Sequence, residues 1–135
     1  MAFSAEPRYL SLADVVAIHG FIMERMGDSA PLRDEGALES AITRPRMAAY
    51  YDGADLVRQA TLLAIGIAQA QAFVDGNKRA AYGAVRAFLR VNGLRFMGEP
   101  LELARQVEAV GERTGSLAGA TDRFEAWLRE RVGPL

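Results

Sequence analysis

Cysteine is absent from the sequence, and histidine occurs once, as His19, among 135 residues. Without cysteine, the chain can form neither a disulfide framework nor a metal site built on thiolates. An excess of one charge is missing too, because 16 basic residues stand against 17 acidic ones and the net charge is −1. A protein whose main task is to hold a nucleic-acid backbone usually carries a basic excess. Nucleic-acid binding is therefore the least favoured class of function.

Long apolar segments are also missing. The longest apolar run, residues 62–68, contains Gly66 and is far shorter than the ~20 residues that a membrane-spanning helix needs. The first ten residues lack the basic-then-apolar order of a secretion signal. The composition, 50% apolar and 24% charged, is ordinary for a soluble protein, and the length suits one domain. We expect a single domain over residues 1–135, in the cytoplasm and not in a membrane.

Apolar residues recur at spacings of three and four along most of the chain, which predicts an all-α fold. About six helices are expected, over residues 12–26, 34–44, 55 to the loop at 73–76, 77–91, 100–110 and 121–132. Pro45 should end the second helix, because a proline disfavours helical backbone in the residue before it. The third helix is apolar nearly all round and should be buried. Residues 94–97 are long enough only for a small hairpin edge.

Several single residues are expected to serve packing. His19 lies on the apolar stripe of the first helix, which favours a hydrogen-bonded core histidine over a catalytic one. Gly66 and Gly83 lie inside predicted helices, where each costs about 1 kcal/mol relative to alanine. Close packing between helices is the expected reason for both glycines. Phe124 and Trp127, at helical spacing, are expected in the core.

The informative stretch is residues 71–79, which read Gln-Ala-Phe-Val-Asp-Gly-Asn-Lys-Arg. A tight turn there leads into a new helix that Asn77 is placed to cap. Lys78 and Arg79 fall in the first turn, where the helix dipole repels cations, unless an anion such as phosphate binds there. Asp75 supplies a carboxylate of the kind that Mg²⁺ accepts next to nucleotide phosphates. The pattern thus predicts a site for a nucleotide with Mg²⁺.

A simpler interpretation of the same stretch is a turn followed by a solvated basic surface. The usual nucleotide motifs, a GxxxxGK[ST] loop and GxGxxG, are absent. From residue 75 to residue 95 the chain carries a net charge of +4, with one acidic and five basic residues: Asp75 against Lys78, Arg79, Arg86, Arg90 and Arg95. This positive charge is typical of a solvated surface, and it would also favour binding of an anionic ligand.

The stretch resembles the signature of the Fic/Doc family, His-x-Phe-x-Asp/Asn-Gly/Ala-Asn-(Gly or Lys)-Arg. Phe73, Asp75, Gly76, Asn77 and Arg79 match it in place. Further segments resemble the death-on-curing (Doc) branch, namely the helix with His19 and residues 31–34, 38–41, 44–45 and 88–93. The resemblance covers residues 8 to 98, and it implies a compact helical domain with the motif loop between two central helices.

Lys78 stands where the family's adenylyltransferases have a glycine that lets the backbone curl round the phosphates. In the family this change accompanies the Doc subgroup, which phosphorylates elongation factor Tu and arrests growth. The resemblance therefore implies a toxin that uses ATP or another nucleoside triphosphate with Mg²⁺, together with a Phd-like antitoxin partner. It assigns the metal to Asp75, and it assigns the nucleotide to Phe73, Gly76, Asn77, Lys78 and Arg79. Protein adenylylation is the alternative that Lys78 disfavours.

Gln71 occupies the place of the family's histidine, which takes the proton from the acceptor hydroxyl. A glutamine amide can orient a hydroxyl but cannot hold its proton, and the loss of a general base costs roughly 10²- to 10⁴-fold in rate. Phosphoryl transfer depends mostly on positioning and charge, so some activity could survive. Asp75, Lys78 and Arg79 complete the expected catalytic set. The alternative is a catalytically degenerate protein that binds nucleotide or antitoxin only.

Overall fold

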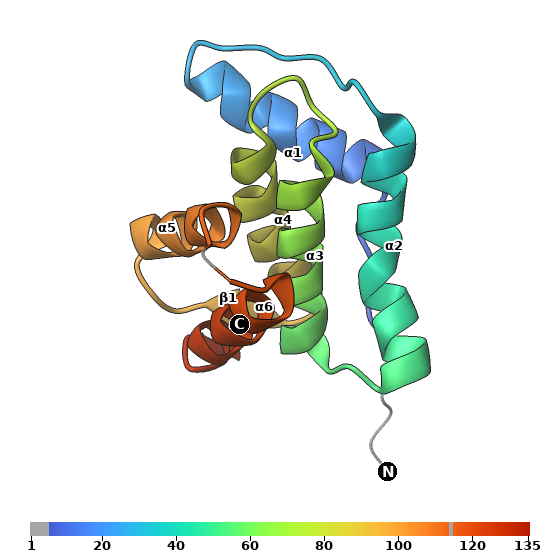
Figure 1. The fold of residues 1–135 in the computed structure, drawn as a ribbon, viewed down its shortest axis with the longest axis vertical. Helices are drawn as coiled ribbons and strands as arrows, with labels where there is room; N and C mark the ends of the chain where they lie inside the picture. The colour runs from blue at the N-terminus through green and yellow to red at the C-terminus, as the bar shows by residue number, and fades with distance from the viewer. Residues whose placement is uncertain (1–5, 114) are drawn as a thin grey trace.

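The computed structural model describes residues 6–113 and 115–135, and in them the chain forms six helices and two short strands (Figure 1). The helices are α1 (Leu12–Arg25), α2 (Glu35–Asp52), α3 (Leu56–Ala70), α4 (Asn77–Val91), α5 (Pro100–Gly111) and α6 (Leu117–Arg129); the strands are β1 (Leu94–Phe96) and β2 (Val132–Pro134). The expectation of an all-α fold is confirmed. None of the helices in the described residues is long and apolar enough to cross a membrane.

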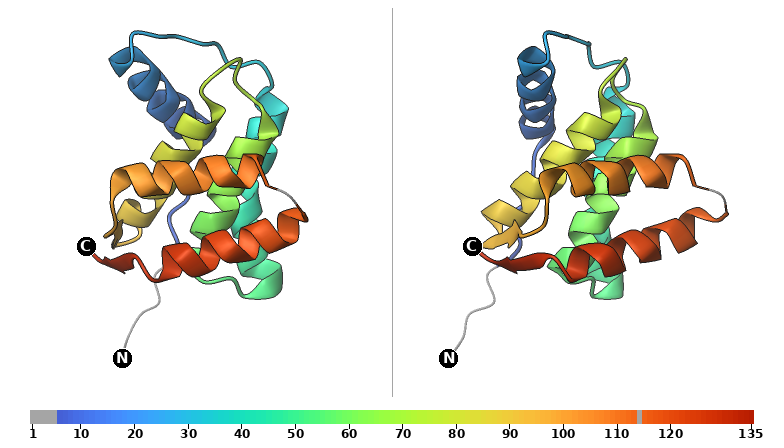
Figure 2. Two further views of the ribbon diagram at one scale, coloured as in Figure 1. Left: turned by 60° about the vertical axis from the view of Figure 1, so that its left-hand side comes forward. Right: turned by 90° about the vertical axis from the view of Figure 1, so that its left-hand side faces the viewer.

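The third helix is the centre of the molecule. Every residue of α3 from 59 to 68 is buried, as expected for a helix that is apolar nearly all round. α2 and α4 pack on either side of α3 (Figure 1). α5 and α6 run side by side across the α3–α4 pair (Figure 2), and α1 crosses the N-terminal half of α4. The loop between α3 and α4 is thereby held at one end of the core.

The prediction that Pro45 ends the second helix is wrong. α2 continues through this proline to Asp52 and ends at Gly53, whose φ of 66° is left-handed. Pro45 removes one backbone hydrogen bond, but its ring is buried against the core, and this burial offsets the local cost. α2 and α3 also approach closely, because a Cβ on Gly66 would lie 3.4 Å from the Cβ of Ala41.

The C-terminal elements differ from the expected ones at both ends of α6. The helix begins at Leu117 because Ser116 caps it, with its hydroxyl accepting from the backbone N–H of Gly119 at 3.0 Å. It ends at Arg129, and the predicted extension to residue 132 is wrong, since β2 follows. β2 pairs antiparallel with β1, so that residues 94–96 find their partner at the end of the chain and not in a hairpin. The short strand gains its stability from this long-range pairing.

The packing roles expected of single residues are confirmed. A Cβ on Gly83 would lie 2.5 Å from Cγ2 of Ile18, so this glycine allows α1 and α4 to approach closely. Phe124 is buried, and Trp127 packs against the core beside Phe96 with ring centroids 5.6 Å apart. His19 is only 2% exposed.

Candidate active site

The loop that carries the motif begins at Gln71, the residue that ends α3. Its φ of 53° and ψ of 36° are left-handed, and among the described residues it is the one non-glycine with a positive φ. Such backbone costs about 1–2 kcal/mol for a residue with a Cβ. The guanidinium of Arg33 donates to the carbonyl of Gln71 at 2.7 Å, which helps to hold this conformation. The side chain of Gln71 is exposed, and its amide donates to the carbonyl of Ala68 at 3.3 Å.

A segment from the α1–α2 connection supports the loop from outside. Leu32 and Phe73 form an antiparallel bridge. On either side of this pair, the N–H of Val74 donates to the carbonyl of Pro31 at 3.0 Å, and the N–H of Arg33 donates to the carbonyl of Ala72 at 2.7 Å. The loop is therefore paired along its backbone and does not depend on its own turn alone.

Asn77 does not cap α4, which corrects the prediction made from its position. The residue before the helix is Gly76, with a φ of 81°, and Asn77 is the first helical residue. Its buried side chain turns back to Phe73, accepting from the backbone N–H and donating to the carbonyl, both at 2.9 Å. Because Gly76 adopts the left-handed conformation, the amide of Asn77 points into the protein. It therefore clamps the loop and leaves the helix end open.

The start of α4 is consequently available to an anion. Within the described residues no side chain caps this end, so the N–H groups of the first turn lack side-chain acceptors. Lys78 and Arg79 lie in the same turn. The side chain of Arg79 is 40% exposed, and its Nη1 lies 3.5 Å from Sδ of Met23 and 3.7 Å from a carboxylate oxygen of Asp28. Three positive features thus converge on one place, and the carboxylate of Asp28 lies beside Arg79.

A pocket of about 730 Å³ opens in front of this helix end. Residues of α1, the loop, the first turns of α4 and the facing side of α5 line it. Gln71, Asp75, Lys78 and Arg79 all line the pocket, together with Glu108 of α5. The structure thus brings the four predicted catalytic residues to one cavity. The side chain of Phe73 is buried beneath the loop and is not among the residues that line this pocket.

Asp75 is the carboxylate expected to hold Mg²⁺. Its carboxylate is exposed, and Oδ1 accepts from the N–H of Gly76 at 2.7 Å. In residues 6–113 and 115–135 no cluster of three or more His, Asp or Glu side chains could hold a metal by itself. One carboxylate beside a phosphate site suits Mg²⁺, which commonly keeps water and phosphate oxygens as its other ligands. The residues present therefore fit a metal that arrives with a nucleotide.

Comparison with known proteins places this arrangement in a family. The model of the Fic/DOC family matches residues 9–89. The chain belongs to the Fic/DOC family. It is 31% identical over 112 residues to "Protein kinase doc" of Escherichia phage P1, covering 82% of this chain and 86% of that protein. It is 34% identical over 95 residues to "Toxin Doc" of Mycolicibacterium smegmatis, covering 67% of this chain and 69% of that protein.

Four residues contact or face the motif in ways that the sequence did not predict. Arg33, Asp28 and Met23 touch the motif from α1 and the segment after it, and Glu108 faces it from α5. The resemblance of residues 31–34 to the Doc branch was the one signal for Arg33. For the other three the sequence held no signal, because their approach depends on how α1 and α5 cross α4.

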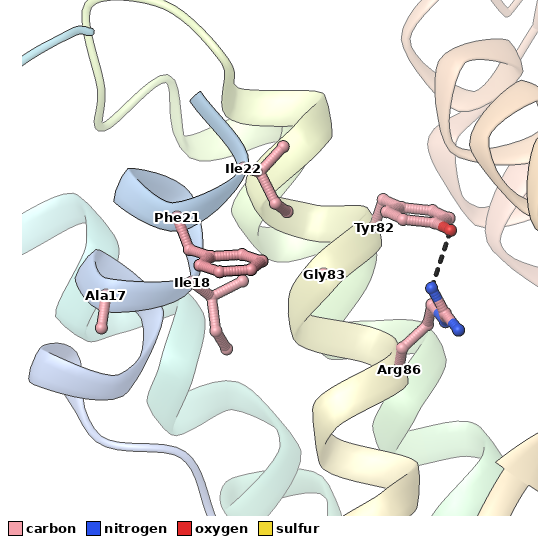
Figure 3. Close-up of a pocket in the computed structure, with 7 residues that line it drawn as sticks. All are labelled: Ala17, Ile18, Phe21, Ile22, Tyr82, Gly83 and Arg86. Atoms are coloured by element: carbon pink, nitrogen blue, oxygen red, sulfur yellow. Dashed lines mark hydrogen bonds between the residues drawn. The ribbon is translucent and has the colours of Figure 1, made fainter. Parts of the chain in front are cut away.

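A second, apolar groove of about 480 Å³ lies between α1 and α4 of this Fic/DOC domain (Figure 3). Gly83 forms part of its wall, and Phe21, 61% exposed, lies on the α1 side (Figure 3). Ile22 and Tyr82 line both this groove and the motif pocket, so the two are adjacent. Arg86 lies on the α4 side and donates to the hydroxyl of Tyr82 at 2.9 Å (Figure 3).

Proposed function

We propose that this Fic/DOC protein transfers a phosphoryl group from a nucleoside triphosphate to a hydroxyl of another protein, with a translation factor similar to elongation factor Tu as the acceptor. The observation that carries the proposal is the uncapped start of α4, with Lys78 and Arg79 in its first turn at an open pocket. Lys78 in the place of a glycine favours phosphoryl transfer over adenylylation. The relative from phage P1 is named a protein kinase, which agrees with this choice.

The positive groups at the pocket would hold the phosphates. The first-turn N–H groups of α4 provide fixed donors, Arg79 a planar fork and Lys78 a movable charge. Arg79 contacts Asp28 at 3.7 Å, too far for a hydrogen bond, and its Nη1 donates to Sδ of Met23 at 3.5 Å, so its other donors remain available to phosphate. Asp75 would hold Mg²⁺ against the phosphate oxygens. When bound, Mg²⁺ neutralises charge that develops during the transfer.

In the proposed step the hydroxyl oxygen of the acceptor bonds to the γ-phosphorus, and the bond from that phosphorus to the bridging oxygen breaks. A nucleoside diphosphate leaves, and the hydroxyl proton passes to solvent. Gln71, exposed at the pocket, can accept a hydrogen bond from the hydroxyl and so orient it, but its amide cannot hold the proton. Transfer is therefore expected to be slow and to depend on positioning and charge.

An antitoxin of the Phd type is the proposed regulatory partner, since the relative from Mycolicibacterium smegmatis is named a toxin. The groove between α1 and α4 suits an amphipathic segment of such a partner. Its apolar wall, with Phe21 largely exposed, would take the apolar face, and Arg25 and Arg86 near its aromatic rings would favour an acidic segment. Because Ile22 and Tyr82 also line the motif pocket, an occupant there would hinder the site.

The test is to incubate the protein with ATP, Mg²⁺ and elongation factor Tu, with the radioactive label on the γ-phosphorus or the α-phosphorus. The proposal predicts label on the factor from the γ position only. Label from the α position would establish adenylylation. If ATP binds but no label is transferred from either position, the protein is a binding member of the family, which is the alternative that Gln71 favours.

A further inference from the structure

His19 is the one histidine of the sequence, and it lies under the motif loop. It belongs to α1, is 2% exposed, and its ring stacks on that of Phe73 with centroids 3.7 Å apart and planes 10° apart. Its Nε2 lies 2.8 Å from the backbone carbonyl oxygen of Asp75. One buried side chain therefore contacts the loop through both a ring and a hydrogen bond.

The direction of this hydrogen bond is fixed by chemistry. A carbonyl oxygen only accepts, so Nε2 of His19 must carry the hydrogen. The accepting oxygen belongs to the planar peptide unit between Asp75 and Gly76. The N–H of the same unit points the opposite way and donates to the Asp75 carboxylate at 2.7 Å. His19 thus bonds to the carbonyl of this peptide unit, and the N–H of the same unit bonds to the Asp75 carboxylate.

The loop also rests directly on the α1 side chains. A Cβ on Gly76 would lie 2.9 Å from Nε2 of His19 and 2.6 Å from Sδ of Met23. Both side chains are nearly fully buried and lie one helical turn apart, so the surface beneath the loop is rigid. A rotation of the peptide unit would break the bond to His19 and the bond to the carboxylate together.

We propose that His19 is a positioning residue of the active site. Its Nε2–H fixes the peptide unit of residues 75–76, and through it the direction of the Asp75 carboxylate and the N–H groups that begin α4. Its loss would loosen the loop and weaken the part of nucleotide binding that depends on Mg²⁺, while the core remains folded. The binding part of this statement rests on the proposed function; the part that concerns the loop does not.

Two substitutions separate positioning from packing. His19→Phe keeps an aromatic ring over Phe73 but removes the donor. His19→Gln places an amide N–H near the position of Nε2 and loses the stack. Amide hydrogen exchange of residues 74–79 should become ~10-fold faster in His19→Phe, the change expected from one lost hydrogen bond, and should return toward the original rate in His19→Gln. Exchange in residues 59–68 of α3 should stay the same in both variants.

Calorimetric titration with ATP provides the second measurement, with Mg²⁺ and again with a chelator. The ratio of the two affinities should fall ~3- to 10-fold in His19→Phe and recover in His19→Gln. Unchanged loop exchange in His19→Phe, a parallel increase in the α3 core, or unfolding of both variants would each overturn the inference. If the unsubstituted protein bound no ATP, the proposed function would fail, and hydrogen exchange would still decide whether His19 positions the loop.

Discussion

Asn77 and Phe73 are joined by two hydrogen bonds in opposite directions, each 2.9 Å long, between one side-chain amide and one backbone residue. The pair closes the motif loop onto the first residue of α4. Both residues are buried, so water cannot replace these bonds. An asparagine in this position therefore has a structural role that is independent of any ligand.

Replacing Asn77 should destabilise the fold. Asn77→Ala leaves the buried N–H and carbonyl of Phe73 without this partner, which should lower the free energy of unfolding by about 1–3 kcal/mol. Asn92→Ala is the control, since Asn92 clamps the backbone of Arg8 at 2.8 and 2.9 Å in an exposed setting and also donates to the carbonyl of Phe88 at 2.8 Å. Water can replace the two exposed bonds to Arg8, so the loss should be smaller than for Asn77→Ala. Urea unfolding measures both, and an equal loss would contradict the buried clamp.

A second pair of substitutions tests how closely the loop lies on α1. Gly76 and Gly93 have nearly the same left-handed φ, 81° and 78°, so alanine introduces similar backbone strain at both. Only at Gly76 would the new Cβ meet other atoms, those of His19 and Met23. Gly76→Ala should therefore lower the free energy of unfolding more than Gly93→Ala does. The difference between the two losses should be about 1–3 kcal/mol, the usual cost of overpacking. Equal losses would mean that the loop moves away at little cost.

Periodicity was enough to predict α1, α3 and α4, because each presents apolar residues at a regular spacing. The end of α3 at Gln71 carried no clear signal, since a non-glycine residue takes the left-handed conformation there. Sequence reasoning failed at Pro45, where burial of the ring outweighs the local preference of proline. It also failed at β1, whose partner lies at the far end of the chain. In each case a contact distant in sequence decided the outcome.

In the candidate site, too, the features set by local sequence could be predicted, and those set by distant contacts could not. The motif itself placed Asp75, Lys78 and Arg79 at one helix start, where the structure has them. The role of Asn77 could not be predicted, because its amide can either cap a helix or bond backward, and the conformation of Gly76 decides between the two. The contact of His19 with the loop depends on the crossing of α1 and α4, which the sequence does not specify.

Acid should weaken the attachment of α6 to α3. Hydrogen bonds from Arg129 lower the pKa of Asp55, and at Glu125 burial raises the pKa but hydrogen bonds from Arg129 and Arg58 outweigh it. Both carboxyl pKa values are depressed in the folded state from ordinary values of 3.8 and 4.5. The stability that they contribute is therefore present above about pH 5 and is lost as the pH falls through the folded values.

Arg129→Gln measures this contribution. Arg129 contacts Asp55 at 2.7 Å and Glu125 at 2.9 Å, so the substitution removes the largest cause of the depressed pKa of Asp55. The variant should be less stable than the original protein at about pH 7, and the difference should shrink toward about pH 3. Urea unfolding at both values provides the comparison. A difference that stays constant with pH would show that the ion pairs are not its source.

Arg79→Ala should weaken nucleotide binding by about 1.5–3 kcal/mol, because charge-assisted hydrogen bonds to phosphate are lost. Arg90→Ala is a control of equal charge change, eleven residues along α4 and therefore about 16 Å away. It should leave the affinity for ATP nearly unchanged at physiological salt, where long-range charge effects are screened. Calorimetric titration with ATP and Mg²⁺ measures the affinity of both variants. Equal effects would mean that Arg79 acts only through net charge.

The rate at which γ-labelled phosphate reaches elongation factor Tu shows what Gln71 costs this protein as a transferase. Gln71→His places a general base at the pocket, and histidine is among the residues enriched in left-handed backbone, so the fold should accept it. Gln71→Gly is the control, which should relieve about 1 kcal/mol of backbone strain without adding a base.

Transfer by Gln71→His should be ~10²-fold or more faster than transfer by the unsubstituted protein, with little change in the affinity for ATP. Gln71→Gly should be more stable and no faster. An inert Gln71→His variant, or one no faster than the unsubstituted protein, would mean that the missing base at residue 71 is not what limits phosphoryl transfer.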